Sequence, residues 1–151
     1  MIIYISEKKL DTSSSQFEIK DESYYTQGMY SAFVTGETVC AGYAEAFEAL
    51  CNAAGLPAVA VTSDEHEWNK VKIGGYWYCF DTTWDDQEKI IYTYYGRSDS
   101  KIKSIDSSNY HNEESLWNGI SPSATYDSES TKENAASLYE KIGRASCRER
   151  V

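Results

Sequence analysis

The stretch VCAGYAEAFEALCNAAG, residues 39–55, decides the fold, because it predicts a half-buried helix that begins at a cysteine. Its apolar residues recur three and four positions apart, which is the spacing of one helix face; they are Tyr43, Ala46, Phe47, Leu50, Cys51 and Ala54. Gly55 and Pro57 predict where the helix ends. With Thr38 as the N-cap, Cys40 lies in the first helical turn.

The position of Cys40 favours a reactive sulfur. The first turn of a helix has unpaired N–H groups and the positive end of the helix dipole, and both stabilise a thiolate, the attacking form of cysteine. A cysteine taken alone is more often a small buried residue, and we assign that role to Cys51 in mid-helix and to Cys79. The spacing of the cysteines contains no CxxC pair, so we expect neither a structural zinc site nor a cofactor.

A β-hairpin is predicted downstream of the helix. Two strand patterns, WNKVKI at residues 68–73 and YWYCFD at residues 76–81, are separated by two glycines. Two glycines between strands are the signature of a tight turn with positive φ angles. If they form the loop, Ile73 faces Tyr76, and every further pair follows by counting.

This register places a histidine and an aspartate on one face of the sheet. The count pairs Trp68 with Asp81 and His66 with Thr83, so His66 and Asp81 become diagonal neighbours. Their Cα atoms would lie about 7 to 8 Å apart, within reach of an imidazole and a carboxylate, provided that no bulge shifts the register. Together with Cys40 they supply a nucleophile, a base and an orienting carboxylate.

Residues 31–86 resemble the core of the bacterial transglutaminase-like family, whose fold is related to that of papain-like cysteine proteases. The family patterns VCxGYAxAF and HAWNxVxIxGxWYxxDxTWDD are followed almost position by position. The resemblance implies an α+β domain with the catalytic cysteine at a helix N-terminus packed on an antiparallel sheet, and a triad of Cys40, His66 and Asp81. One departure is Glu67, where the family usually has alanine, and strand alternation points this side chain away from the His66 face.

The resemblance implies thiol-dependent acyl transfer on peptide or glutamine side-chain amides, with a protein or peptide as the substrate. Hydrolysis and transfer to an amine use the same residues, so both remain open. Trp68, Trp77 and Trp84 are candidate substrate-binding residues, although each is equally well explained as a core aromatic. The alternative is a non-catalytic domain that binds a peptide or a cell-wall component.

Flanking segments carry weaker predictions. Residues 25–34 predict a helix beside the catalytic one, residues 89–95 a strand, and residues 98–115 a long polar excursion. A weaker family likeness runs through this part; it involves Tyr94, Gly96 to Asp99, His111, Trp117 and Pro122.

Composition and charge limit the partners. The chain has 151 residues, 41% of them hydrophobic, which is enough for one globular domain with its own core. A net charge of −10 argues against nucleic acid and anionic membrane surfaces, which require basic patches. No stretch is long and apolar enough to insert into a membrane. The tyrosine-rich, Ser/Asp/Asn-decorated composition resembles that of Gram-positive surface proteins, so we expect an extracellular or cell-surface location in a bacterium.

Three segments are expected along the chain. Residues 1–126 form the transglutaminase-like domain, and residues 127–141 read as a polar linker or truncated continuation. Residues 142–151, IGRASCRERV, resemble the translation of a sequencing adapter, so we expect an artefact there. This tail carries a net charge of +2, which leaves −12 for the rest of the chain. Without Cys147 three cysteines remain, too few for a disulfide framework.

Overall fold

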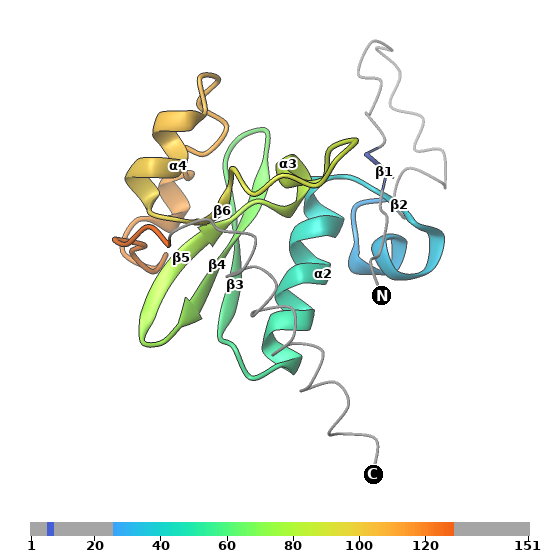
Figure 1. The fold of residues 1–151 in the computed structure, drawn as a ribbon, viewed down its shortest axis with the longest axis horizontal. Helices are drawn as coiled ribbons and strands as arrows, with labels where there is room; N and C mark the ends of the chain where they lie inside the picture. The colour runs from blue at the N-terminus through green and yellow to red at the C-terminus, as the bar shows by residue number, and fades with distance from the viewer. Residues whose placement is uncertain (1–5, 8–25, 129–151) are drawn as a thin grey trace.

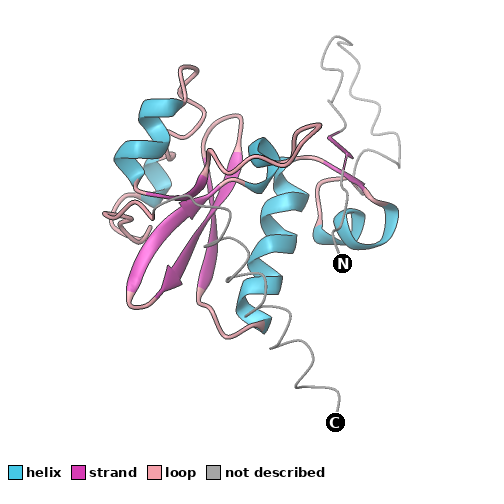
Figure 2. Ribbon diagram, in the orientation of Figure 1, coloured by secondary structure: helices cyan, strands magenta, loops and turns pink. Residues whose placement is uncertain are grey.

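The computed structural model describes residues 6–7 and 26–128. A four-stranded antiparallel sheet, in the order β3-β4-β5-β6, has helix α2 on one face and helix α4 on the other (Figures 1 and 2). The α+β architecture expected from the sequence is confirmed. The elements are β1 (Ser6–Glu7), the π-helical turn η1 (Ser31–Thr35), β2 (Glu37–Thr38), α2 (Cys40–Ala53), β3 (Ala58–Thr62), β4 (Glu67–Ile73), β5 (Tyr76–Phe80), α3 (Thr82–Asp85), β6 (Tyr95–Arg97), α4 (Asp99–Ile105) and the 3-10 turn η2 (Ser115–Trp117).

The predicted helix is α2, and its first residue is Cys40. The predicted N-cap is wrong: Val39 occupies that position, without a side-chain cap, whereas Thr38 lies in β2 and donates its hydroxyl to the carbonyl of Thr26 at 2.6 Å. The Thr38 hydroxyl lies close to the backbone of Gly42. Glycine is required there, because a Cβ would collide with this hydroxyl. The residue that was expected to cap the helix therefore ties its start to the preceding loop.

The hairpin has the predicted turn and register. Asn69 faces Phe80 and Ile73 faces Tyr76, and the two loop glycines have φ angles of 60° and 95°, which favour glycine. The ladder ends at the Asn69–Phe80 pair, so the counted pairs beyond it do not form. The reason is Asp81, which leaves the sheet to become the N-cap of α3.

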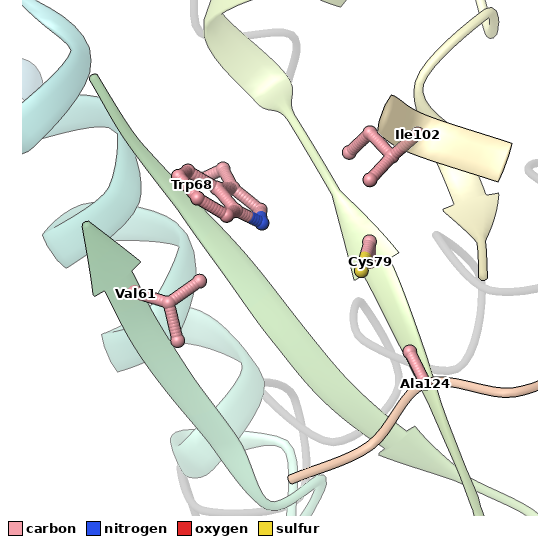
Figure 3. Close-up of a cluster of buried hydrophobic side chains, with 5 residues drawn as sticks. All are labelled: Val61, Trp68, Cys79, Ile102 and Ala124. Carbon is pink, nitrogen blue, oxygen red and sulfur yellow. The ribbon is translucent and has the colours of Figure 1, made fainter. Parts of the chain in front are cut away.

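Alternation along the strands separates two hydrophobic clusters. On the α2 side, Cys51 packs with Ala58, Val71 and Phe80. We call this the helix-side core. The outer-face core lies on the α4 side; its members are Val61, Trp68, Cys79, Ile102 and Ala124 (Figure 3). Packing in the helix-side core fixes α2 relative to the hairpin, and this positions the residues at the end of the sheet.

Several flanking predictions need correction. The helix expected at residues 25–34 is shorter, because helical residues begin at Met29 and continue into η1. The strand expected at residues 89–95 is displaced to β6. The polar excursion contains a helix, α4, whose single buried apolar residue, Ile102, produced no periodic signal.

The expected linker and tail fall mostly outside the described residues. Within them, Asp127 accepts hydrogen bonds from the backbone and hydroxyl of Ser98, at 2.8 and 3.1 Å, and the backbone N–H of Ser128 donates to Gly96 at 2.7 Å. Residues 129–141 and the predicted artefact at 142–151 lie outside the described part of the chain.

Candidate active site

Three chain segments meet at one end of the sheet. Figure 1 shows the first turn of α2 next to α3, at the end where β3 passes into β4 and where β5 stops. Cys40 occupies the first position of α2 and is partly exposed. The N–H groups of this first turn have no acceptor inside the helix, so they are available to donate to a negatively charged group at the helix start.

His66 is held by the loop that joins β3 to β4. The Ser63 backbone N–H donates to the His66 carbonyl at 2.9 Å, and the His66 N–H donates to the Ser63 hydroxyl at 3.1 Å. This closed loop places the imidazole just before β4, with 7% of the residue exposed. Its Nε2 lies 2.7 Å from Oδ2 of Asp81.

The predicted contact between His66 and Asp81 is therefore present in the structure, although it arises differently from the count. Asp81 is 1% exposed, and as the α3 N-cap its Oδ1 accepts the Trp84 backbone N–H at 3.0 Å. Local capping thus fixes one carboxylate oxygen and leaves the other for imidazole. Burial would raise the Asp81 pKa, but hydrogen bonds from His111 and His66 outweigh it and lower the pKa.

The His66 imidazole contacts both Asp81 and Cys40. Burial by itself would lower the His66 pKa, but hydrogen bonds and charge interactions with Asp81 and Cys40 raise it to about 9. Since Nε2 bonds Asp81, Nδ1 is the nitrogen available to the sulfur. At neutral pH the favoured state of His66 is therefore the imidazolium.

A second histidine, absent from the predicted site, completes the cluster. His111 is fully buried, and its Nε2 lies 2.9 Å from the same Asp81 oxygen that faces His66. The only sequence signal for it was the weak family likeness beyond residue 86. Its separation of 30 residues from Asp81 hides this contact from any local pattern.

The three predicted tryptophans have different positions. Trp84 lies against His66, with ring centroids 5.2 Å apart. Trp68 stacks on His66 at 6.2 Å but is 1% exposed, so it supports the imidazole from behind and offers no surface to a substrate. Trp77 packs against the outer-face core. Of the three, Trp84 alone combines partial exposure with contact to His66.

The other two described cysteines are buried thiols, as the sequence predicts. Burial, followed by the charge of Glu48, raises the pKa of Cys51 to about 12. Burial and the charge of Asp99 also raise the pKa of Cys79. Both residues therefore stay protonated at neutral pH.

A cavity of about 310 Å³ opens beside the site. Its lining comes from the β3–β4 loop and from the segment on both sides of His111; the residues are Ser63, Asp64, Glu65, Ser108, Asn109, Tyr110 and Asn112. Tyr110 also contacts His66, with ring centroids 6.2 Å apart. The cavity is polar, and its wall includes the chain neighbours of His66 and His111, but none of Cys40, His66, Asp81 and His111 lines it.

The grouping of His66, Asp81 and His111 raises the question of a metal. Their ligand atoms lie within 4.8 Å of one another. Ligand atoms around a tetrahedral zinc ion are about 3.3 Å apart, as metal distances of 2.0–2.1 Å require. The Asp81 oxygen is 2.7 and 2.9 Å from the two imidazole nitrogens, so these contacts are hydrogen bonds.

A comparison with known families identifies the superfamily of the chain. A model of the transglutaminase-like superfamily matches residues 7–82, a span that includes Cys40, His66 and Asp81. The chain belongs to the transglutaminase-like superfamily. No curated protein matches it. Among the described residues, no helix has the length and apolar character needed to cross a membrane.

Proposed function

We propose that the protein is a cysteine-nucleophile enzyme that transfers acyl groups from peptide or glutamine side-chain amides. Membership of the superfamily supports the class of chemistry. The observation that carries the assignment of residues is His66, which contacts both Asp81 and Cys40 at the start of α2. In this proposal Cys40 is the nucleophile, His66 the proton carrier and Asp81 the group that orients the imidazole.

The first half of the reaction forms an acyl-enzyme. The Cys40 thiolate attacks the amide carbonyl carbon, and the carbonyl oxygen becomes negatively charged. The Cys40 backbone N–H, free at the helix start, is one donor for this oxygen. His66 then gives its proton to the amide nitrogen, the C–N bond breaks, and ammonia or an amine leaves.

The second half regenerates the enzyme. Neutral His66 takes a proton from water or from an incoming amine, which attacks the thioester carbonyl, and the Cys40 thiolate leaves. Asp81 holds the Nε2–H of His66 through both halves and stabilises the imidazolium state. Hydrolysis and amide exchange differ only in the acceptor that reaches the thioester.

A paired assay tests this proposal. The protein is incubated with a glutamine-containing peptide and a fluorescent primary amine, and we measure ammonia release, peptide cleavage and amine incorporation. We expect turnover in the wild type, none in Cys40→Ala, and near wild-type turnover in the matched control Cys51→Ala, whose thiol is buried. Peptide binding without turnover or acyl-enzyme in the wild type would contradict the proposal and favour a binding domain.

A further inference from the structure

His111 lies in the loop after α4 and shares the Asp81 carboxylate with His66. Asp81 Oδ2 accepts from His66 Nε2 at 2.7 Å and from His111 Nε2 at 2.9 Å. Oδ1 is already bound to the Trp84 N–H. Three groups thus occupy three of the about four lone-pair positions of this buried carboxylate, and His111 is one of them.

The His111 ring is fixed independently of Asp81. Asp106, the C-cap of α4, accepts the His111 backbone N–H at 2.8 Å and faces the ring Nδ1 at 3.1 Å, both through Oδ2. Its other oxygen accepts the Ser108 N–H at 2.9 Å, which holds the loop itself. Aromatic side chains surround the imidazole; they are Trp68 at 5.1 Å, Trp84 at 4.8 Å and Tyr94 at 5.5 Å between ring centroids.

Both His111 nitrogens face carboxylate oxygens, and a carboxylate can only accept. An imidazole donates from both nitrogens only when it is protonated. In that form His111 lies between the Asp81 and Asp106 carboxylates, and Asp81 lies between His66 and His111. Each buried charge has neighbours of opposite sign, which is the condition for keeping charges in a low-dielectric interior.

We propose that His111, anchored by Asp106, is a positioning residue that holds the Asp81 carboxylate in the orientation that aligns His66 with Cys40. The inference rests on the proposed function, because it concerns the same site. It explains why Asp106 and His111 are buried polar side chains in a loop whose other residues are exposed or half-buried. His111 does not touch the reacting atoms and acts through Asp81.

Several groups face His66 and must be considered in any pH measurement. The titratable ones are Cys40 from α2 and Asp81 at the end of β5, and Glu67 is the next residue along the chain. The uncharged ones are the rings of Trp68, Trp84 and Tyr110. None of these residues changes in the variants described below.

The test compares His111→Phe, which fills the aromatic site without donating, with His111→Gln, which can donate to Asp81. The readout is the rate of Cys40 alkylation by iodoacetamide between about pH 5 and pH 9, measured by peptide mapping. We expect half-maximal alkylation of His111→Phe at a pH about one unit higher than in the wild type, so that its rate near pH 6 falls about tenfold. His111→Gln should stay within about threefold of the wild type, because it restores a donor.

NMR of the imidazole nitrogens provides a second readout that packing alone would not change. In the wild type the neutral His66 ring should carry its proton on Nε2, the nitrogen that faces Asp81. In His111→Phe we expect a mixture of both tautomers. A folded His111→Phe protein with the wild-type alkylation profile and a single His66 tautomer would overturn the proposal.

If His111→Phe does not fold, Asp106→Asn carries the test, because it weakens the anchor and leaves the imidazole in place. We expect the rate of Cys40 alkylation near pH 6 to fall about threefold in this variant, which is the same direction as in His111→Phe. An unchanged rate would overturn the positioning role. A wild-type Cys40 that reacts no faster than glutathione near pH 6 would instead mean that the ion pair, and with it the proposed function, is wrong.

Discussion

Two regions of the same sheet contain a thiol, a cation and carboxylates, yet they differ in what they can do. One is the candidate site around Cys40. The other is the Lys70 cluster, which we define as Lys70, Asp99, Glu113 and the Cys79 thiol. Lys70 is 2% exposed, and its ammonium group lies 2.9 Å from Asp99 and 2.6 Å from Glu113.

The Lys70 cluster is closed. The ammonium group also donates to the Ser121 hydroxyl at 2.9 Å and to the Pro122 carbonyl at 2.8 Å, so all its donors are used. The Cys79 thiol donates to Asp99 at 3.3 Å and is fully buried. This arrangement fastens the start of α4 and two loop segments to β4, and it buries both the ammonium group and the thiol.

The candidate site is open on one side. Its sulfur is partly exposed at a helix start, and the cation next to it, His66, can lose its proton. The comparison teaches that a cation near a thiol does not make a nucleophile. Three properties decide whether a thiol can react: the exposure of the sulfur, a neighbouring cation that can lose its proton, and the charge of the nearest carboxylate.

The largest expected effect concerns Asp81. We predict that Asp81→Asn folds but loses about 10²- to 10⁴-fold in kcat/KM, because the amide no longer fixes the imidazole or stabilises its charge. Circular dichroism checks the fold and the peptide assay checks the rate. The matched control is Asp86→Asn, whose carboxylate accepts from Tyr43 at 2.6 Å and does not contact His66. Equal losses in both variants would contradict a special role for Asp81.

Lys70→Met should separate stability from reactivity. Loss of the ammonium group leaves Asp99 and Glu113 without their cation, and we expect the free energy of unfolding to fall by about 2 kcal/mol. The rate of Cys40 alkylation in the folded variant should not change. Urea denaturation and peptide mapping provide the two measurements, and a slower Cys40 would show that the two regions are coupled.

The pH dependence follows from His66. Because its pKa is raised to about 9, we predict that kcat/KM falls about tenfold per pH unit above that value, as the proton donor is lost. The same shift stabilises the folded protein fully below the unfolded-state value of about 6.5, and this contribution disappears as the pH rises through about 9. An activity limb near pH 6.5 instead would indicate an imidazole without its anionic neighbours.

The smallest effect is expected at Glu67. Burial, then the charges of Glu45 and Glu48, raise the Glu67 pKa to about 7. Because ionisation is disfavoured in the folded state, stability falls as the pH rises from about 4.5 through about 7. Glu67→Gln should reduce this fall, which thermal unfolding at about pH 5 and pH 8 can detect. An identical fall in wild type and variant would contradict the assignment.

The sequence predicts those features that depend on local order. The α2 helix, the glycine turn and the register from Asn69 to Ile73 follow from spacing and turn chemistry. Asp81 shows the limit, because capping of a short helix overrides strand continuation and still delivers the carboxylate to His66. Residues after position 86 that contact the site lie in long loops, and the sequence there has no periodicity that would predict these contacts.

Two residues, His111 and Lys70, show why contacts with the chain after residue 86 could not be predicted. His111 reaches Asp81 across 30 residues, and its role depends on Asp106 and on the aromatic rings around it. Lys70 occupies an outer-face core position in β4, where alternation predicts an apolar side chain. Only the arrival of Asp99 and Glu113 on that face explains a buried lysine.

The most direct test of the central claim is the competition of thiols for iodoacetamide near pH 6, followed by peptide mapping. If Cys40 is held as a thiolate beside the His66 imidazolium, it should react at least about 100-fold faster than Cys51 and Cys79 and faster than free glutathione. Equal labelling of Cys40 and Cys79, or a Cys40 rate no higher than that of glutathione, would contradict the account.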